Sequence, residues 1–255
     1  MEFVDTHTHI TDEAFQGEEE QVIRRAIDAG VTIMLQADTG SEEREQMYRL
    51  CEAHPGVLYP MLGLYPGNVD ENWRDQIDAM LPYWSRRPVA VGEIGLEYHY
   101  TRETAGLQKQ AFKAQLELAR DRGLPVNIHL REATEDFLSI MEECRGMQLR
   151  GNLHAFSGSA ELFERMQRYG EWYVGIGGVL TFKKAHIAED IKRIPMERIL
   201  LETDAPYLAP TPLRGTRNES ANIPIIAAKL AEIKGMPVQE VSAVTTSNAR
   251  KLFAL

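Results

Sequence analysis

The phrase FVDTHTHI, residues 3 to 10, places two histidines, His7 and His9, two positions apart. The phrase begins like a short β-strand, in which side chains at positions i and i+2 project from the same face. Two imidazoles held in that way can bind one metal ion. A structural pair of buried histidines has the same spacing, so the metal interpretation depends on whether other ligands converge on the same place.

Other short apolar runs also carry side chains that can bind metal: Glu93 in PVAVGEIG, His129 in LPVNIHL, His154 in GNLHAFSG and Asp204 in ILLETDAPY. A single residue of this kind often caps a helix. If the runs are neighbouring strands, however, the six side chains converge in one mouth that could hold two divalent ions. Imidazoles suit zinc and other transition ions, and the two oxygens of Glu93 can bridge two cations.

Asp204 and Glu93 are the predicted catalytic residues. Asp204 would hold the first ion, and it would also act as the base that accepts a proton from water whose pKa the metal lowers. The product would be a hydroxide nucleophile at neutral pH. Glu93, as a bridge, would offset the charge of both ions.

Short apolar runs alternate with longer amphipathic stretches along the chain, and eight of the runs are predicted strands. This alternation predicts a parallel sheet covered by helices, and right-handed crossovers leave a doubly wound sheet or a (β/α)8 barrel. Eight strands in one domain-sized length favour the barrel, whose active sites lie at the C-terminal strand ends. We therefore expect residues 1–255 to form a single α/β domain. The runs begin at Phe3, Val31, Gly56, Pro88, Leu124, Gly151, Trp172 and Ile199.

Three further stretches carry local signals. Residues 105–122 are predicted to be a helix, because apolar residues recur near helical spacing and Gly123 and Pro125 follow. The last stretch, 221–253, is predicted to form two helices separated by KGMP, which serve as a lid or as closing helices. The string GIGG from Gly175 lacks the spacing of a dinucleotide-binding motif and indicates close packing at a strand end.

The composition limits the class of protein. The chain has 255 residues, of which 44% are hydrophobic, and no run approaches the ~18 apolar residues of a membrane span. The N-terminus lacks the basic and apolar regions of a signal peptide, so we expect a cytoplasmic protein without a membrane partner. Cys51 and Cys144 are predicted to be packing residues. A net charge of −10 argues against broad adhesion to nucleic acid, so any polyanion must be bound locally.

Five motifs occur in order along the chain: DTHTH, GEIGLEYH, IHLREA, HAFSGS and LLETDAPYLAP. In combination they resemble the TatD-type metal-dependent hydrolases, or TatD-like deoxyribonucleases, of the amidohydrolase superfamily. The resemblance runs essentially from end to end and implies a distorted TIM barrel with two divalent ions, such as Mg, Zn or Mn. It also implies a deoxyribonuclease, often with 3'-to-5' exonuclease activity. By this resemblance one ion is held by His7, His9, Glu93 and Asp204, and the other by Glu93, His129 and His154.

Candidate substrate-binding residues surround these motifs. The family usually has a GLHPH type of phrase where this chain has GLYPGN, so Tyr65 replaces a histidine. A phenol can donate a hydrogen bond to a phosphate, but it cannot carry positive charge as imidazolium does. Arg131, His99 and Arg214 are the other predicted substrate contacts, and Glu202 is predicted to support a ligating histidine. Further basic candidates for phosphate are Lys183, Lys184 and Arg217.

Three functions remain open from the sequence. The first is a two-metal phosphodiesterase acting on DNA or another phosphoester. The second is a small-molecule amidohydrolase or esterase using the same hydroxide, which the acidic composition and Tyr65 favour. The third is a noncatalytic metal-binding protein, which the six intact ligand positions disfavour. The sequence does not determine the native metal or the oligomeric state.

Overall fold

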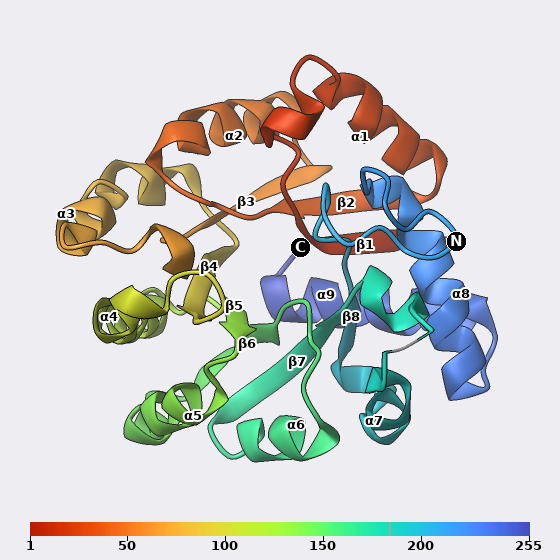
Figure 1. The fold of residues 1–255 in the computed structure, drawn as a ribbon. Coiled ribbons are helices and arrows are strands. Elements are labelled where there is room, and N and C mark those ends of the chain that lie inside the picture. The colour runs from red at the N-terminus through yellow and green to blue at the C-terminus, as the bar shows by residue number, and fades with distance from the viewer. Residues whose placement is uncertain (184) are drawn as a thin grey trace.

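Eight parallel strands form the centre of the molecule. The computed structural model describes residues 1–183 and 185–255, and the side chains of these except that of residue 42. The strands pair in sequence order, and a parallel bridge between Thr8 and Ala205 joins the last strand to the first (Figure 1). This confirms the predicted TIM-type barrel. The strands are β1 (Phe3–Thr8), β2 (Val31–Gln36), β3 (Leu58–Leu62), β4 (Ala90–Glu97), β5 (Val126–Arg131), β6 (Leu149–Leu153), β7 (Gly170–Ile176) and β8 (Ile199–Leu201).

Helices surround the barrel on its outside (Figure 1). Each side of the barrel is covered because a parallel strand pair needs a crossover, and the crossover helix packs back onto the sheet. No helix in the described part of the chain combines the length and the apolar character that a membrane crossing needs. The α-helices are α1 (Glu19–Asp28), α2 (Ser41–Ala53), α3 (Trp73–Asp78), α4 (Ala105–Arg122), α5 (Thr134–Glu143), α6 (Ala160–Met166), α7 (Ile187–Arg193), α8 (Ile223–Lys234) and α9 (Val238–Phe253).

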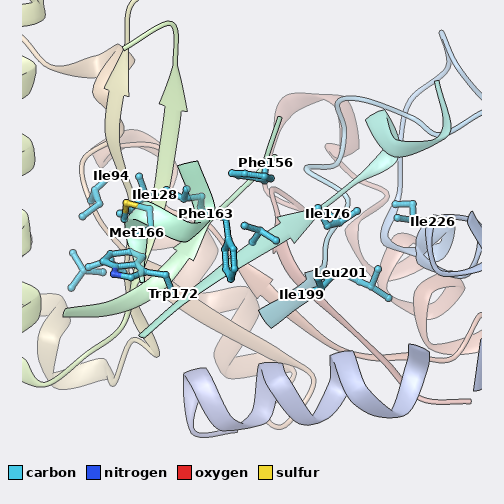
Figure 2. Close-up of a cluster of buried hydrophobic side chains, with 14 of the residues drawn as sticks. Ile94, Ile128, Phe156, Phe163, Met166, Trp172, Ile176, Ile199, Leu201 and Ile226 are labelled. Carbon is cyan, nitrogen blue, oxygen red and sulfur yellow. The ribbon is translucent and has the colours of Figure 1, made fainter. Parts of the chain in front are cut away.

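Apolar side chains fill two regions of the barrel. Between the strands and the outer helices, Phe163 and Met166 of α6 belong to one buried cluster with Trp172 of β7 (Figure 2). Inside the barrel, Leu35 of β2 and Tyr173 of β7 belong to a cluster with Leu252 of α9. Strands that are buried on both faces have nearly continuous apolar sequences, which explains why the short apolar runs predicted their positions.

The last helix closes the barrel at the end opposite the predicted site. Thr246 of α9 donates a hydrogen bond to the carbonyl of Glu2, 2.9 Å away, just before β1 begins. Asn248 donates to the carbonyl of Ile199, 2.8 Å away, at the start of β8. The prediction of closing helices is therefore confirmed for α9, and its alternative of a lid is wrong, because the apolar face of this helix completes the interior cluster.

Helix α4 spans the predicted residues and ends at Gly123, which has a left-handed φ of 64°. Two buried glutamines of this helix hold the loops that lead into the site. Gln115 accepts a hydrogen bond from the amide of Leu64 at 2.7 Å, and Gln108 accepts one from the amide of Glu97 at 2.8 Å. The helix thus fixes the backbone on either side of the third and fourth strand ends.

Several strand boundaries differ by about two residues from the predicted runs, and those of the sixth and eighth strands affect the site. The sixth strand begins at Leu149, before the predicted Gly151, and ends at Leu153, so His154 follows it directly. The eighth strand contains three residues, so Asp204 lies in the loop beyond it, with a left-handed φ of 58°. The chain leaves the sheet there because the buried Asp5 accepts hydrogen bonds from the Thr203 hydroxyl at 2.6 Å and the Thr203 amide at 3.0 Å.

Glu171 of β7 is expected to stabilise the end of the barrel that α9 closes, and to do so in a pH-dependent way. It accepts hydrogen bonds from Arg198 at 2.8 Å and Lys251 at 2.6 Å, and Lys251 first, then Arg198, outweighs burial and lowers the pKa of the carboxyl to about 2. The folded pKa lies below the ordinary 4.5, so the stabilisation is complete above about pH 4.5 and is lost as the pH falls toward 2.

Glu171→Gln should therefore lower the free energy of unfolding by about 1 kcal/mol at neutral pH, after allowance for solvent screening. Urea unfolding curves at about pH 7 and pH 3 measure this, and the difference from wild type should shrink at the lower pH. Glu189→Gln, in an exposed pair with Lys192, is the matched control and should change little. An equal difference at both pH values contradicts the prediction.

Candidate metal centre

The six predicted ligands lie together at the C-terminal end of the barrel. His7, Glu93 and His129 are held by β1, β4 and β5, and the other three lie in the first turn after a strand. Backbone hydrogen bonds fix these three: the amide of His9 donates to the carbonyl of Ala205 at 2.8 Å, that of His154 to the carbonyl of Ile128 at 2.9 Å, and that of Asp204 to the carbonyl of His7 at 2.9 Å. Parallel strands bring equivalent ends of distant segments to one place, as the sequence predicted.

One group of ligand atoms surrounds the two histidines of the first strand. The Nε2 atoms of His7 and His9 are 3.0 Å apart. Asp204 Oδ1 lies 3.5 Å from the Nε2 of His7 and 3.4 Å from that of His9. Glu93 Oε2 lies 3.5 Å and 3.9 Å from the same two nitrogens. Four side chains thus direct one atom each toward a common centre.

A second group surrounds the other oxygen of Glu93. Its Oε1 lies 2.8 Å from His129 Nδ1 and 2.8 Å from His154 Nε2. The two nitrogens are 3.1 Å apart. One oxygen of Glu93 therefore faces each pair of histidines, which is the arrangement that a bridging carboxylate requires.

These separations fit a metal site. Ligand nitrogens and oxygens around an ion at ~2.1 Å lie roughly 3.0 to 3.4 Å from one another, and most distances in the first group fall in or near that range. The chemistry also fits, because borderline imidazole and hard carboxylate ligands together suit zinc, manganese and similar ions. Combinations of His7 and His9 with Asp204, and of His7 and His154 with Glu93, are close enough to share an ion.

The charges of the centre match this use. Burial would raise the pKa of the Glu93 carboxyl, but His154 and His7 hold that pKa well below its ordinary value. Burial would likewise raise the pKa of Asp204, and its hydrogen bond with His9 is the largest of the effects that lower it. Both groups are therefore carboxylates at neutral pH, the form that coordinates a cation.

Two buried side chains outside the predicted set of site residues hold the histidine rings in place. Asn127 Oδ1 lies 2.8 Å from His7 Nδ1, and Glu97 Oε2 lies 2.9 Å from His129 Nε2. Because a carboxylate only accepts, His129 donates from Nε2 and its Nδ1 lone pair faces Glu93. The sequence spacing could have indicated both residues. Asn127 precedes His129 by two residues on one strand, and Glu97 ends the same strand as Glu93.

Glu202 lies beside His154, as its predicted supporting role requires. It is fully buried, its Oε1 lies 3.7 Å from His154 Nδ1, and it accepts a hydrogen bond from the amide of Ala155. Gly175 makes room for this carboxylate, because a Cβ at that position would overlap Glu202. The GIGG string thus permits close packing at a strand end, as predicted. The functional role of Glu202 stays a prediction.

Glu97→Gln is expected to weaken metal binding about 10- to 100-fold, the usual cost of losing a partner that orients a ligating histidine. A glutamine amide can donate to His129 Nε2, which moves the ring proton to Nδ1, the atom that faces Glu93. Chelator competition with Mn²⁺ or Zn²⁺ measures the change.

Glu132→Gln is the matched control, because Glu132 also accepts from a histidine, His99 at 2.7 Å, but outside the centre. Equal metal affinity of the two variants would refute the orienting role of Glu97.

A cavity of about 830 Å³ opens above the centre. Glu93, His129 and Asp204 line its floor, and the predicted contacts Tyr65 and Arg131 line its walls. The Tyr65 ring lies 5.2 Å from the His129 ring, and burial raises the pKa of its phenol, which stays a neutral donor. The volume is sufficient for a substrate the size of a nucleotide.

The other predicted substrate contacts do not line this cavity. His99 pairs with Glu132, and the Arg214 guanidinium lies 4.4 Å from the Phe182 ring. Their roles in substrate binding stay predictions without support from the geometry. Among the further basic candidates, Arg217 forms an ion pair with Glu18 at 2.9 Å, Lys183 is exposed, and Lys184 lies outside the described residues.

Fold and site together define a barrel hydrolase of the metal-dependent class, with histidine and carboxylate side chains that could hold metal at the C-terminal strand ends. The chain belongs to the TatD related DNase family, whose sequence profile matches residues 4–254.

Known relatives cover nearly the whole chain. It is 33% identical to the metal-dependent hydrolase YabD of Bacillus subtilis, itself uncharacterised, over 98% of both chains. It is 34% identical to the 3'-5' ssDNA/RNA exonuclease TatD of Pantoea vagans, over 98% of this chain and 99% of that one. The crystal structure of YjjV, a TatD homologue from Escherichia coli, superposes with a TM-score of 0.92 at 30% identity, covering 99% of this chain and 98% of that chain. The predicted family and the metal-dependent hydrolase class are confirmed.

Proposed function

We propose that this enzyme is a two-metal phosphodiesterase that releases nucleotides from the 3' end of single-stranded DNA or RNA, and that residues 1–255 act as one domain. The observation that carries the proposal is the position of Glu93, with one oxygen toward each pair of histidines. The exonuclease name of the Pantoea relative supports the substrate class.

The first group, His7, His9, Glu93 and Asp204, would hold one ion, and Glu93 with His129 and His154 would hold the other. Divalent ions in such a centre lower the pKa of water and offset charge on the phosphate oxygens.

The residues of this chain divide the remaining work. A water oxygen bonds to phosphorus, the bond from phosphorus to the 3' oxygen of the preceding nucleotide breaks, and Asp204 accepts a proton of the water. The departing 3' oxygen ends as a hydroxyl with a proton from solvent, and the product is a nucleoside 5'-monophosphate. Tyr65 donates a hydrogen bond to the phosphate, and Arg131 balances its charge from the wall of the cavity.

The test uses protein purified without chelators and analysed for metal. Wild type should release mononucleotides from a 5'-labelled single-stranded oligonucleotide, EDTA should stop the release, and added Mn²⁺ or Mg²⁺ should restore it. His129→Ala should be inactive. Absence of release by the metal-loaded wild type, or equal release by His129→Ala, would overturn the proposal.

A small-molecule amidohydrolase or esterase is the second candidate, and Tyr65 favours it. A neutral phenol in place of a histidine suits an uncharged carbonyl better than a negatively charged phosphodiester. A panel of esters, amides and lactones, compared with phosphodiesters under one metal condition, separates the two functions. Turnover confined to phosphodiesters would eliminate the second.

A further inference from the structure

Two exposed tyrosines stand at the mouth of the cavity. Tyr100 follows β4 and is 68% exposed, and Tyr207 follows β8 and is 54% exposed. Both line the same cavity as Glu93 and Asp204. Large exposed rings that border an active site are typical of surfaces that bind an apolar or aromatic partner.

The wall at Tyr100 is basic. The Arg131 guanidinium lies 4.7 Å from the centre of the Tyr100 ring, in a cation–π contact that holds both side chains at the rim. Arg131 is the single lysine or arginine among the described residues that line the cavity. This wall therefore combines a ring with the charge that attracts a phosphate backbone.

The wall at Tyr207 is acidic. The Tyr207 hydroxyl donates a hydrogen bond to Asp12 at 2.8 Å, and its ring lies 6.2 Å from the ring of His9. Asp12 and Glu43 also line the cavity on this side. Carboxylates disfavour a further phosphate but accept hydrogen bonds from a sugar hydroxyl, so this wall suits a nucleoside that ends the chain.

We propose that the two tyrosines stack the two bases that flank the scissile phosphate. Tyr207 stacks the base of the 3'-terminal nucleoside, and Tyr100 stacks the base before it, while Arg131, beside Tyr100, balances the charge of the scissile phosphate. This inference rests on the proposed function and specifies its substrate: a free single-stranded end with a 3' hydroxyl. Stacking tolerates every base, so little sequence preference is expected.

The experiment pairs enzyme variants with oligonucleotides that lack one base. Tyr207→Ala and Tyr100→Ala should each lower kcat/KM on single-stranded DNA about 10-fold, chiefly through KM, within the range measured for loss of one stacked base. An abasic 3'-terminal residue should cost wild type a similar factor and cancel the effect of Tyr207→Ala. An abasic penultimate residue should cancel the effect of Tyr100→Ala in the same way.

Phenylalanine variants separate the ring from the hydroxyl. Tyr100→Phe and Tyr207→Phe should keep most of the activity, because each retains its ring. Leu81→Ala, at an exposed apolar side chain away from the cavity, is the control for surface changes and should match wild type.

The outcomes distinguish this inference from the function on which it rests. If wild type releases no nucleotides, the proposed function fails. If wild type is active but the alanine variants lose equal activity on intact and abasic substrates, the stacking proposal is overturned. If the abasic 3'-terminal residue cancels the effect of Tyr100→Ala, and the abasic penultimate residue that of Tyr207→Ala, the assignment of each tyrosine to its base is overturned.

Discussion

Glu93→Gln is expected to lower the rate of phosphodiester hydrolysis by about 10³-fold or more, equivalent to roughly 4 kcal/mol of transition-state stabilisation. Glu93 is fully surrounded by the four histidines, and each of its oxygens faces a different pair. A neutral amide offers one oxygen and one NH₂ group, so it can coordinate on one side only. The variant should therefore lose the bridge, and with it most of one bound metal.

Metal content per chain and single-turnover rates on a labelled oligonucleotide measure this effect together. Glu171→Gln serves as the matched control, because the same substitution is made at a strand residue that accepts a hydrogen bond from Arg198 and does not line the cavity. Near-wild-type rates in Glu93→Gln, with an unchanged metal content, would show that this carboxylate does not bridge. Urea unfolding shows whether the Glu93→Gln variant is folded. If part of it is unfolded, its metal content and its rate are evaluated for the folded fraction alone.

Asp204→Asn is expected to lower kcat by about 10² to 10⁴-fold, the usual contribution of a positioned general base. The second group of predicted ligands does not include Asp204, so the ion that this second group would hold should remain bound. Most of the loss should therefore lie in kcat, with a smaller loss of metal than in Glu93→Gln. Because the pKa of Asp204 lies below its ordinary value, wild type should show no activity step from this group between about pH 5 and 8.

Rates and metal content of Asp204→Asn are compared with those of Asp136→Asn. Asp136 accepts a hydrogen bond from Tyr98 at 2.6 Å outside the cavity, and its substitution should leave kcat unchanged. An Asp204→Asn enzyme with wild-type kcat would exclude Asp204 as the base. Complete loss of both metals would assign it a ligand role alone.

The architecture and the residues expected to bind metal could both be predicted from local sequence. Apolar runs of strand length, separated by amphipathic helices, allow few topologies, because parallel strands need right-handed crossovers. In a barrel of that kind all strands point the same way, so His7, Glu93 and His129 had to meet at one end. Residue chemistry then indicated a metal, since imidazoles and carboxylates at one place are ligands for divalent ions.

Which side chains contact the histidines, and which residues line the cavity, depended on the tertiary structure. Glu97 reaches His129, and Asn127 reaches His7, across neighbouring or distant strands whose relative stagger is not written in local periodicity. The path of each loop decided that Arg131 lines the cavity while His99 faces Glu132 outside it.

Packing also determined which end of the barrel α9 covers and where Asp204 lies at the other end. The amphipathic pattern of α9 was readable, but whether its apolar face would cover the site or the opposite end depended on which interior surface was left open. The short β8 likewise placed Asp204 in a loop, where hydrogen bonds from Thr203 to Asp5 hold it beside His9. Local sequence sets the type and order of elements, and long-range contacts set their final geometry, because those contacts join residues far apart in the chain.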